Sequence, residues 1–99
     1  MQAHATRKFF NSRAKEDTLP GQIYFSVMMM YLDPGLREIH YSQFALRMTD
    51  FMQSVGDPRA VAACVDISKD VMSGAYYRAL RKCKALAEFD SEPAHAISA

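Results

Sequence analysis

The segment from residue 23 to residue 32 constrains this chain most, because it is apolar nearly all the way round a helix. It reads IYFSVMMMYL, with Ser26 among nine apolar or aromatic residues. A helix with apolar residues on every side has to be covered by other parts of the fold. We expect either that this helix is central, with three other helices around it, or that part of its surface closes a homodimer. A buried strand is the alternative for the segment, since so short an apolar run does not separate the two structures.

Proline and glycine residues divide the chain into segments whose apolar residues recur at helical spacing. Asp33-Pro34 and Asp57-Pro58 each place a carboxylate at an N-cap and a proline at the first helical position, where its missing N–H costs nothing. Gly74 is expected to take the left-handed conformation that ends one helix before the next begins. The sequence therefore predicts an all-α fold, a small domain of four helices over about residues 20–32, 34–55, 58–73 and 75–89.

Three of these segments carry an apolar stripe that is expected to face the core. The stripes consist of Tyr41, Phe44, Met48, Phe51, Met52 and Val55, of Val61, Cys64, Val65, Ser68, Val71 and Met72, and of Tyr76, Ala79, Leu80, Cys83, Leu86 and Ala87.

Length and composition bound the domain organisation. The chain has 99 residues, room for one domain, and 49% apolar against 23% charged residues is an ordinary globular balance. We expect the domain at residues 18–90, between a basic N-terminal segment at 1–17 and a tail at 91–99, both disordered unless something binds them. The longest apolar run, residues 27–32, is far below the roughly 18 residues that cross a bilayer, and no secretory signal is apparent. The expected location is the cytoplasm, without contact with a membrane.

The sequence does not contain the constellation of reactive groups that an enzyme needs. Cys64 and Cys83 are 19 positions apart and are expected to be buried thiols, not zinc ligands or a disulfide. His40 has no carboxylate or cysteine three or four positions away. Asp66 and Asp70 lie one helical turn apart, but without a third ligand they are expected to form a solvated helix face. We therefore expect no catalytic site, no metal and no cofactor.

The cations are unevenly distributed, although the formal net charge is only +1. Residues 1–15 and 78–84 each hold four cations and no acidic residue. A basic helix face with an aromatic residue beside it is able to hold RNA phosphates while the ring stacks on an unpaired base. The alternative is that the cations only complement the helix dipole. The candidate RNA-binding residues are Tyr77, Arg78, Arg81, Lys82 and Lys84, with Arg7 and Lys8 from the first cluster.

A second candidate surface is rich in methionine, a residue that adapts to several partners. Met28, Met29, Phe44 and Met48 are candidates to line an apolar groove that binds a helix of a protein partner. The alternative is that these side chains fill the core.

Several motifs occur in an order known from one bacterial family. LPGQIYF at 19–25 leads through three methionines at 28–30 to Leu-Asp-Pro at 32–34. Gly-Ala-Tyr-Tyr at 74–77 then precedes ALRKCKAL at 79–86. Over about residues 18 to 90, this order resembles the helical C-terminal part of the FlbT family, regulators of flagellin synthesis.

The resemblance implies a function in flagellum biogenesis. It implies a post-transcriptional regulator, usually a repressor, that associates with the 5′ untranslated region of flagellin messenger RNA and acts alongside the protein FlaF. The family resemblance also implies a strand-rich portion ahead of these helices, which is missing here, so we expect a fragment or a shortened relative. The alternative function is a helical adaptor that binds flagellin or a FlaF-like partner without contacting RNA.

Overall fold

Residues 18–90, the part of the chain that the computed structural model describes, are helical and include no strand. The expected all-α fold is confirmed, and the strand alternative for residues 23–32 is wrong. The predicted N-terminal segment, with Arg7 and Lys8, and the predicted tail lie outside the described residues. The elements are α2 (Leu19–Leu32), a 3-10 turn η1 (Pro34–Leu36), α3 (Arg37–Val55), α4 (Pro58–Met72), α5 (Tyr76–Cys83) and α6 (Leu86–Asp90).

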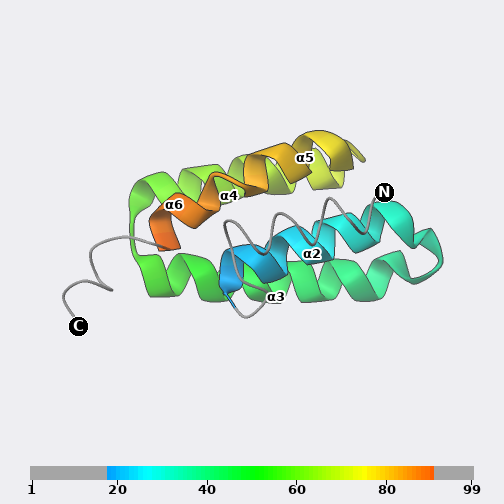
Figure 1. Cartoon of the computed structure of the whole chain (residues 1–99), viewed down its shortest axis with the longest axis horizontal. Coiled ribbons are helices and arrows are strands. Elements are labelled where there is room, and N and C mark those ends of the chain that lie inside the picture. Colours follow the sequence, from blue (N-terminus) through cyan, green and yellow to red (C-terminus); the bar gives the residue numbers. More distant parts are fainter. Residues whose placement is uncertain (1–17, 91–99) are drawn as a thin grey trace.

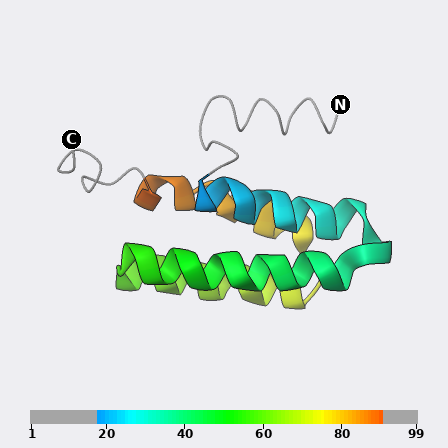
Figure 2. The same cartoon turned by 90° about the horizontal axis from the view of Figure 1, so that it is seen from below.

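The helices form two layers, with α3 beside α4 in one and α2 beside α5 and α6 in the other (Figure 2). Because α2 packs against α3, α5 and α6, it holds the central position that its apolar sequence requires. Ile23, Val27 and Met30 are fully enclosed there, while Phe25 and Tyr31 on its outer side stay exposed. Figure 1 shows the other consequence of this arrangement, that α4 and α5 form one long edge of the bundle and α2 and α3 the opposite edge. No described helix combines the length and the apolarity that a membrane span requires.

Side-chain caps explain where α2 and α4 begin. The Thr18 hydroxyl accepts a hydrogen bond from the Gly21 N–H at 3.2 Å, and the Asp57 carboxylate accepts one from the Arg59 N–H at 2.9 Å. Asp57 and Pro58 therefore start α4 as the sequence predicts.

Asp33 and Pro34 stand at the predicted N-cap and first positions, but of the 3-10 turn η1, and the Asp33 carboxylate makes no capping hydrogen bond there. This carboxylate instead pairs with His40 Nε2 at 3.0 Å, and Arg37 Nε donates to the Met30 carbonyl at 2.8 Å. These contacts tie the start of α3 to the end of α2 across the 3-10 turn, so the regular helix begins at residue 37 and not at residue 34.

Gly56 ends α3 with a φ of 65°, a left-handed conformation that favours glycine, and Gly74 does the same after α4 with a φ of 81°. Nothing lies within 4 Å of a Cβ added at Gly56, so the cost of a side chain there is purely one of backbone conformation. We expect Gly56→Ala to lower the free energy of unfolding by about 1 kcal/mol, measured by urea denaturation followed by circular dichroism. The control is Gly35→Ala, where φ is not positive and the nearest atom is 3.9 Å away, and the stability should be unchanged or raised by about 0.5 kcal/mol. Equal effects of the two changes would contradict this account.

The predicted core is correct on α5, correct on α3 apart from Tyr41, and partly wrong on α4. Phe44, Met48 and Phe51 are buried on α3, although Tyr41 is exposed. On α4, three stripe residues that were expected in the core, Val61, Val65 and Met72, are exposed, by 39%, 48% and 72%. The buried face of α4 is made instead by Ala60, Cys64, Ile67, Asp70 and Val71.

The single predicted helix over residues 75–89 is in fact two, α5 and α6. The N–H groups of Ala85 and Ala87 bond to carbonyls three residues back, at Lys82 and Lys84, which tightens the chain there. Phe89 of α6 lies under the Arg59 guanidinium, whose Cζ atom is 5.6 Å from the ring centroid. The break therefore lets α6 contact both α2 and α4.

Candidate functional site

The basic face of α5 gathers the described candidates for RNA contact. Ala79, Leu80 and Cys83 turn inward and are buried. The helical repeat then places the polar residues of α5 on the outer side. Tyr77, Arg78 and Arg81 are exposed there, Lys82 is half-buried, and Lys84 is exposed just beyond the end of the helix.

Two of these cations face carboxylates from α4. Arg78 Nε lies 3.2 Å from Asp70 Oδ1, and Lys82 Nζ lies 2.9 Å from Asp70 Oδ2 and 2.7 Å from Asp66 Oδ2. Asp66 and Asp70 were expected to form a solvated helix face, but Asp70 is only 7% exposed and joins α4 to α5. Its burial is possible because both of its oxygens have cationic partners.

The ion pairs shift the titration of their members. The hydrogen bond from Lys82 lowers the pKa of Asp70, helped by the charges of Lys82 and Arg78 and opposed by burial. The hydrogen bonds to Asp66 and Asp70 raise the pKa of Lys82. Both groups are therefore held in their charged forms across the neutral range.

Stability should depend on pH through this network. The pKa of Asp70 is lowered on folding, so its stabilising contribution is present above its unfolded value of roughly 3.9 and is lost as the pH falls through the folded value. The pKa of Lys82 is raised, so its contribution is present below roughly 10.4 and is lost as the pH rises through the folded value. We expect Asp70→Asn to reduce the loss of unfolding free energy as the pH falls, measured by urea denaturation from neutral pH downward. The control is Asp50→Asn, at an exposed aspartate of α3, which should leave that loss unchanged. The same dependence on pH in the two variants would refute the role of Asp70.

Arg81 and Tyr77 form the most accessible part of the basic face. The Arg81 Cζ atom lies 5.9 Å from the centroid of the Tyr77 ring, and Tyr77 is 67% exposed. Within residues 18–90, Arg81 has no carboxylate partner at ion-pair distance. This pair therefore offers a cation and an aromatic face to a ligand together.

The methionine-rich surface lies mostly inside the protein. Met28, Phe44 and Met48 are buried in the core, and Met29 packs against it. These side chains fill the core, which was the alternative reading of the sequence.

Sequence reasoning missed an exposed apolar strip on α4 that meets the start of α3 at one end. Tyr41 near the start of α3 meets Met72 at the end of α4, with its hydroxyl 3.5 Å from the Met72 sulfur. Val61 and Val65 lie on the same side of α4 as Met72 by the helical repeat. We call these four residues the α3–α4 seam. An open groove of about 510 Å³ lies at its end, bordered by Met30, Tyr41, Met72 and Tyr76 among others.

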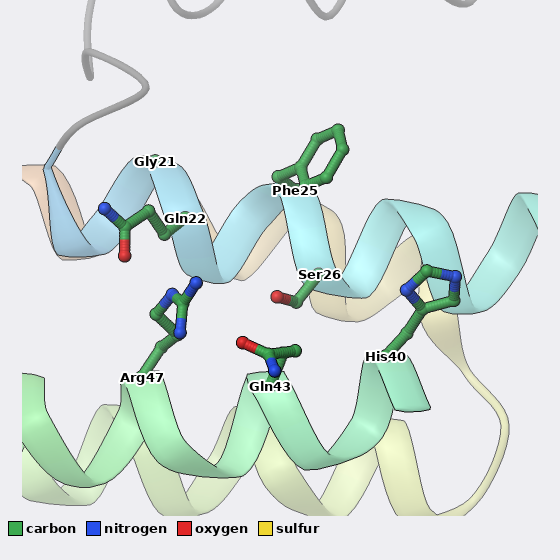
Figure 3. Close-up of a pocket in the computed structure, with 7 residues that line it drawn as sticks. All are labelled: Gly21, Gln22, Phe25, Ser26, His40, Gln43 and Arg47. Carbon is green, nitrogen blue, oxygen red and sulfur yellow. The ribbon is translucent and has the colours of Figure 1, made fainter. Parts of the chain in front are cut away.

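A cavity between α2 and α3, lined by both polar and apolar groups, was also missed. It has a volume of about 270 Å³. Residues 40, 43 and 47 recur at helical spacing, so they lie on one face of α3. This spacing is the sequence signal that could have indicated the cavity. The lining residues, drawn in Figure 3, are Gly21, Gln22, Phe25 and Ser26 from α2 and His40, Gln43 and Arg47 from α3. Within the described part of the chain, no group of three or more His, Cys, Asp or Glu residues is placed to hold a metal ion.

Comparison with known proteins relates this chain to a set of bacterial proteins. The family model described as "Flagellar protein FlbT" matches residues 12–93. A "Probable flagellum biosynthesis repressor protein FlbT" of a Caulobacter species is 44% identical over 78 residues, 78% of this chain and 60% of that protein. Its counterpart in Caulobacter vibrioides is 46% identical over 70 residues, 71% of this chain and 50% of that protein. The chain thus spans about half to three fifths of the length of these curated relatives. No solved structure matches it.

Proposed function

Because this chain belongs to the FlbT family, whose model covers residues 12–93, we propose that it regulates flagellum biosynthesis by binding and not by catalysis. Its relatives are named as repressors of that process, which supports negative regulation. In the proposed mechanism the chain associates, in the cytoplasm, with the 5′ untranslated region of flagellin messenger RNA and lowers flagellin synthesis after transcription. The observation that carries the RNA contact is the exposed pair of Arg81 and Tyr77 on α5.

The pair suits an unpaired stretch of RNA. The Arg81 guanidinium presents paired N–H donors whose geometry matches two phosphate oxygens, and the Tyr77 ring offers a surface on which a base is able to stack. Arg78 and Lys82 border the pair, and their side chains remain 56% and 36% exposed beside their carboxylate partners. Since Asp70 and Asp66 offset part of this charge, we expect few phosphate contacts and a modest dependence of affinity on salt.

Titration of a labelled flagellin leader RNA at several salt concentrations tests the proposal. Affinity should fall with salt, and Arg81→Gln should reduce the slope of log affinity against log salt by about 0.7, the effect of one lost phosphate contact on a single strand. Tyr77→Ala should weaken binding by about tenfold and leave the slope unchanged, because stacking releases no counterions. Arg59→Gln, at an exposed arginine held by Asp57 at the start of α4, is the control and should bind like the unaltered chain. An affinity for the RNA that does not change with salt, or that Arg81→Gln leaves unchanged, would contradict RNA contact at α5.

The α3–α4 seam favours a second candidate function. Here the chain is a helical adaptor that binds flagellin or a FlaF-like protein without contacting RNA. Exposed side chains such as Val65 and Met72 would be removed from water by an apolar partner helix, which is the main driving force of such docking.

Calorimetric titration with purified flagellin, and separately with a FlaF-like protein, tests the adaptor function. Val65→Asp should abolish binding, whereas Leu46→Asp, at a similarly exposed position on the outer side of α3, should not. Binding should persist at high salt, unlike binding to RNA. If the chain alone forms a homodimer that Val65→Asp dissociates, the seam is a self-association surface and the adaptor function fails.

A further inference from the structure

The charges that α4 and α5 bring together cancel one another. Arg78 and Lys82 of α5 meet Asp66 and Asp70 of α4 in a single cluster of ion pairs. The four formal charges sum to zero, so these two cations add no net charge to the basic face of α5. Arg81 differs from them, because it has no carboxylate at ion-pair distance within residues 18–90. The basic face therefore holds more cationic side chains than it has net positive charge.

The two carboxylates of the cluster differ in exposure. The Asp70 side chain is only 10% exposed and meets both cations, whereas the Asp66 side chain is 56% exposed and meets Lys82 at 2.7 Å. A buried carboxylate that loses its partners is costly, but an exposed ion pair contributes little to stability. Asp70 is therefore the residue that joins α4 to α5, and the fold does not require the charge of Asp66.

Asp66 stands where a phosphate would have to approach Lys82. A phosphate placed on the Lys82 ammonium comes close to the Asp66 carboxylate, and like charges repel each other. The affinity of a cation for RNA arises from the counterions that its phosphate contact releases. A lysine that is already neutralised by a carboxylate of the same chain supplies little of this gain. The hydrogen bonds to Asp66 and Asp70 also raise the pKa of Lys82, so the lysine stays charged and paired.

We propose that Asp66 limits the affinity of this chain for RNA, because its carboxylate competes with RNA phosphates for Lys82. The inference rests on the proposed function in one respect, that RNA contacts the basic face of α5. It extends that function by naming a residue that acts against binding. Arg81 and Tyr77 then make the contacts that hold the RNA, while Lys82 is kept from the phosphates by its partner on α4.

Salt titration of the full chain tests the inference, with labelled flagellin leader RNA and a labelled oligouridylate as probes. Asp66→Asn should steepen the slope of log affinity against log salt by about 0.7, the effect of one added phosphate contact on a single strand. At a salt concentration of about 0.1 M, this slope corresponds to a gain of about fivefold in affinity. Asp66→Ser removes the same charge and should give the same gain, which keeps the test decisive if one variant does not fold.

Asp50→Asn is the matched control. It changes the net charge by the same amount, at an exposed aspartate of α3, on the edge of the bundle opposite to α4 and α5 (Figure 1). Because salt screens such distant charges, this variant should leave the slope unchanged and raise the affinity by less than about twofold. Equal effects of Asp66→Asn and Asp50→Asn would overturn the inference, since Asp66 would then act only through net charge.

A second background shows whether Asp66 acts through Lys82. In a chain that carries Lys82→Met, Asp66→Asn should no longer steepen the slope, because the ammonium that it releases is gone. A gain of the same size in the two backgrounds would contradict competition for Lys82.

The outcomes separate this inference from the proposed function. If both probes bind through Arg81 and Asp66→Asn changes nothing, the inference fails alone. If Asp66→Asn steepens the slope but leader RNA binds no more tightly than the oligouridylate, Asp66 limits binding to RNA in general and the specific function at flagellin messenger RNA fails. If neither probe binds the unaltered chain or Asp66→Asn, both fail.

Discussion

Replacing Phe51 by alanine is expected to lower the free energy of unfolding by about 3–5 kcal/mol. Phe51 is fully buried on α3, in the core between the two layers of helices. Its truncation removes apolar contacts and leaves a cavity that the surrounding helices only partly close. A domain of ordinary stability has about 5–15 kcal/mol in total, so the change should remove a large share of it. Urea denaturation followed by circular dichroism measures the effect.

Phe25→Ala is the matched control for that change. The same atoms are removed from α2, but at a side chain that is 47% exposed, so the loss should stay below about 1.5 kcal/mol. A similar loss from the two variants would mean that the core does not lie between the layers as described.

The two cysteines should be almost inert in the folded protein. Burial raises the pKa of Cys64 from 9.0 to about 11, and burial together with the neighbouring Cys64 raises the pKa of Cys83 further still. The thiolate is the reactive form of cysteine. An increase of about two in the pKa lowers the thiolate population about a hundredfold at pH 8. We therefore expect Ellman's reagent to react with the native chain at least about a hundredfold more slowly than with the chain in urea.

A Ser42→Cys variant supplies the internal standard for this measurement. Position 42 is exposed on α3, so the added thiol should react at an ordinary rate in both states. Rapid reaction of Cys64 or Cys83 in the unaltered native chain would contradict their burial.

The helices could be predicted because their signals are local. Asp57 and Pro58 are adjacent in sequence, so the start of α4 needs no knowledge of the rest of the fold. Gly74 likewise adopts its left-handed conformation where the sequence places it. Asp33 shows the limit of such reasoning, because His40 reaches its carboxylate only after α2 and α3 have packed.

The surfaces could be predicted only in part, because they depend on which helices become neighbours. The helical repeat is sufficient to group Arg78 and Arg81 on one side of α5, but not to place Asp70 opposite them. Similarly, the repeat groups Gln43 with Arg47 on α3, while the cavity exists only because α2 lies against that face. Pairing between elements is therefore the information that the sequence pattern lacks.

The buried carboxylate on α4 determines how that helix is rotated about its own axis. Two apolar arcs on α4 compete for the interior, one with Ala60 and Ile67, the other with Val61 and Val65. With the first arc inward, Asp70 reaches the cations of α5, and a rotation that buried the second arc instead would cost these ion pairs. An apolar residue at position 70 would bring the two orientations closer in energy, and one sequence would then populate two conformers with different outer surfaces. The specificity of this small bundle thus depends on a single acidic side chain as well as on the shape of its interior.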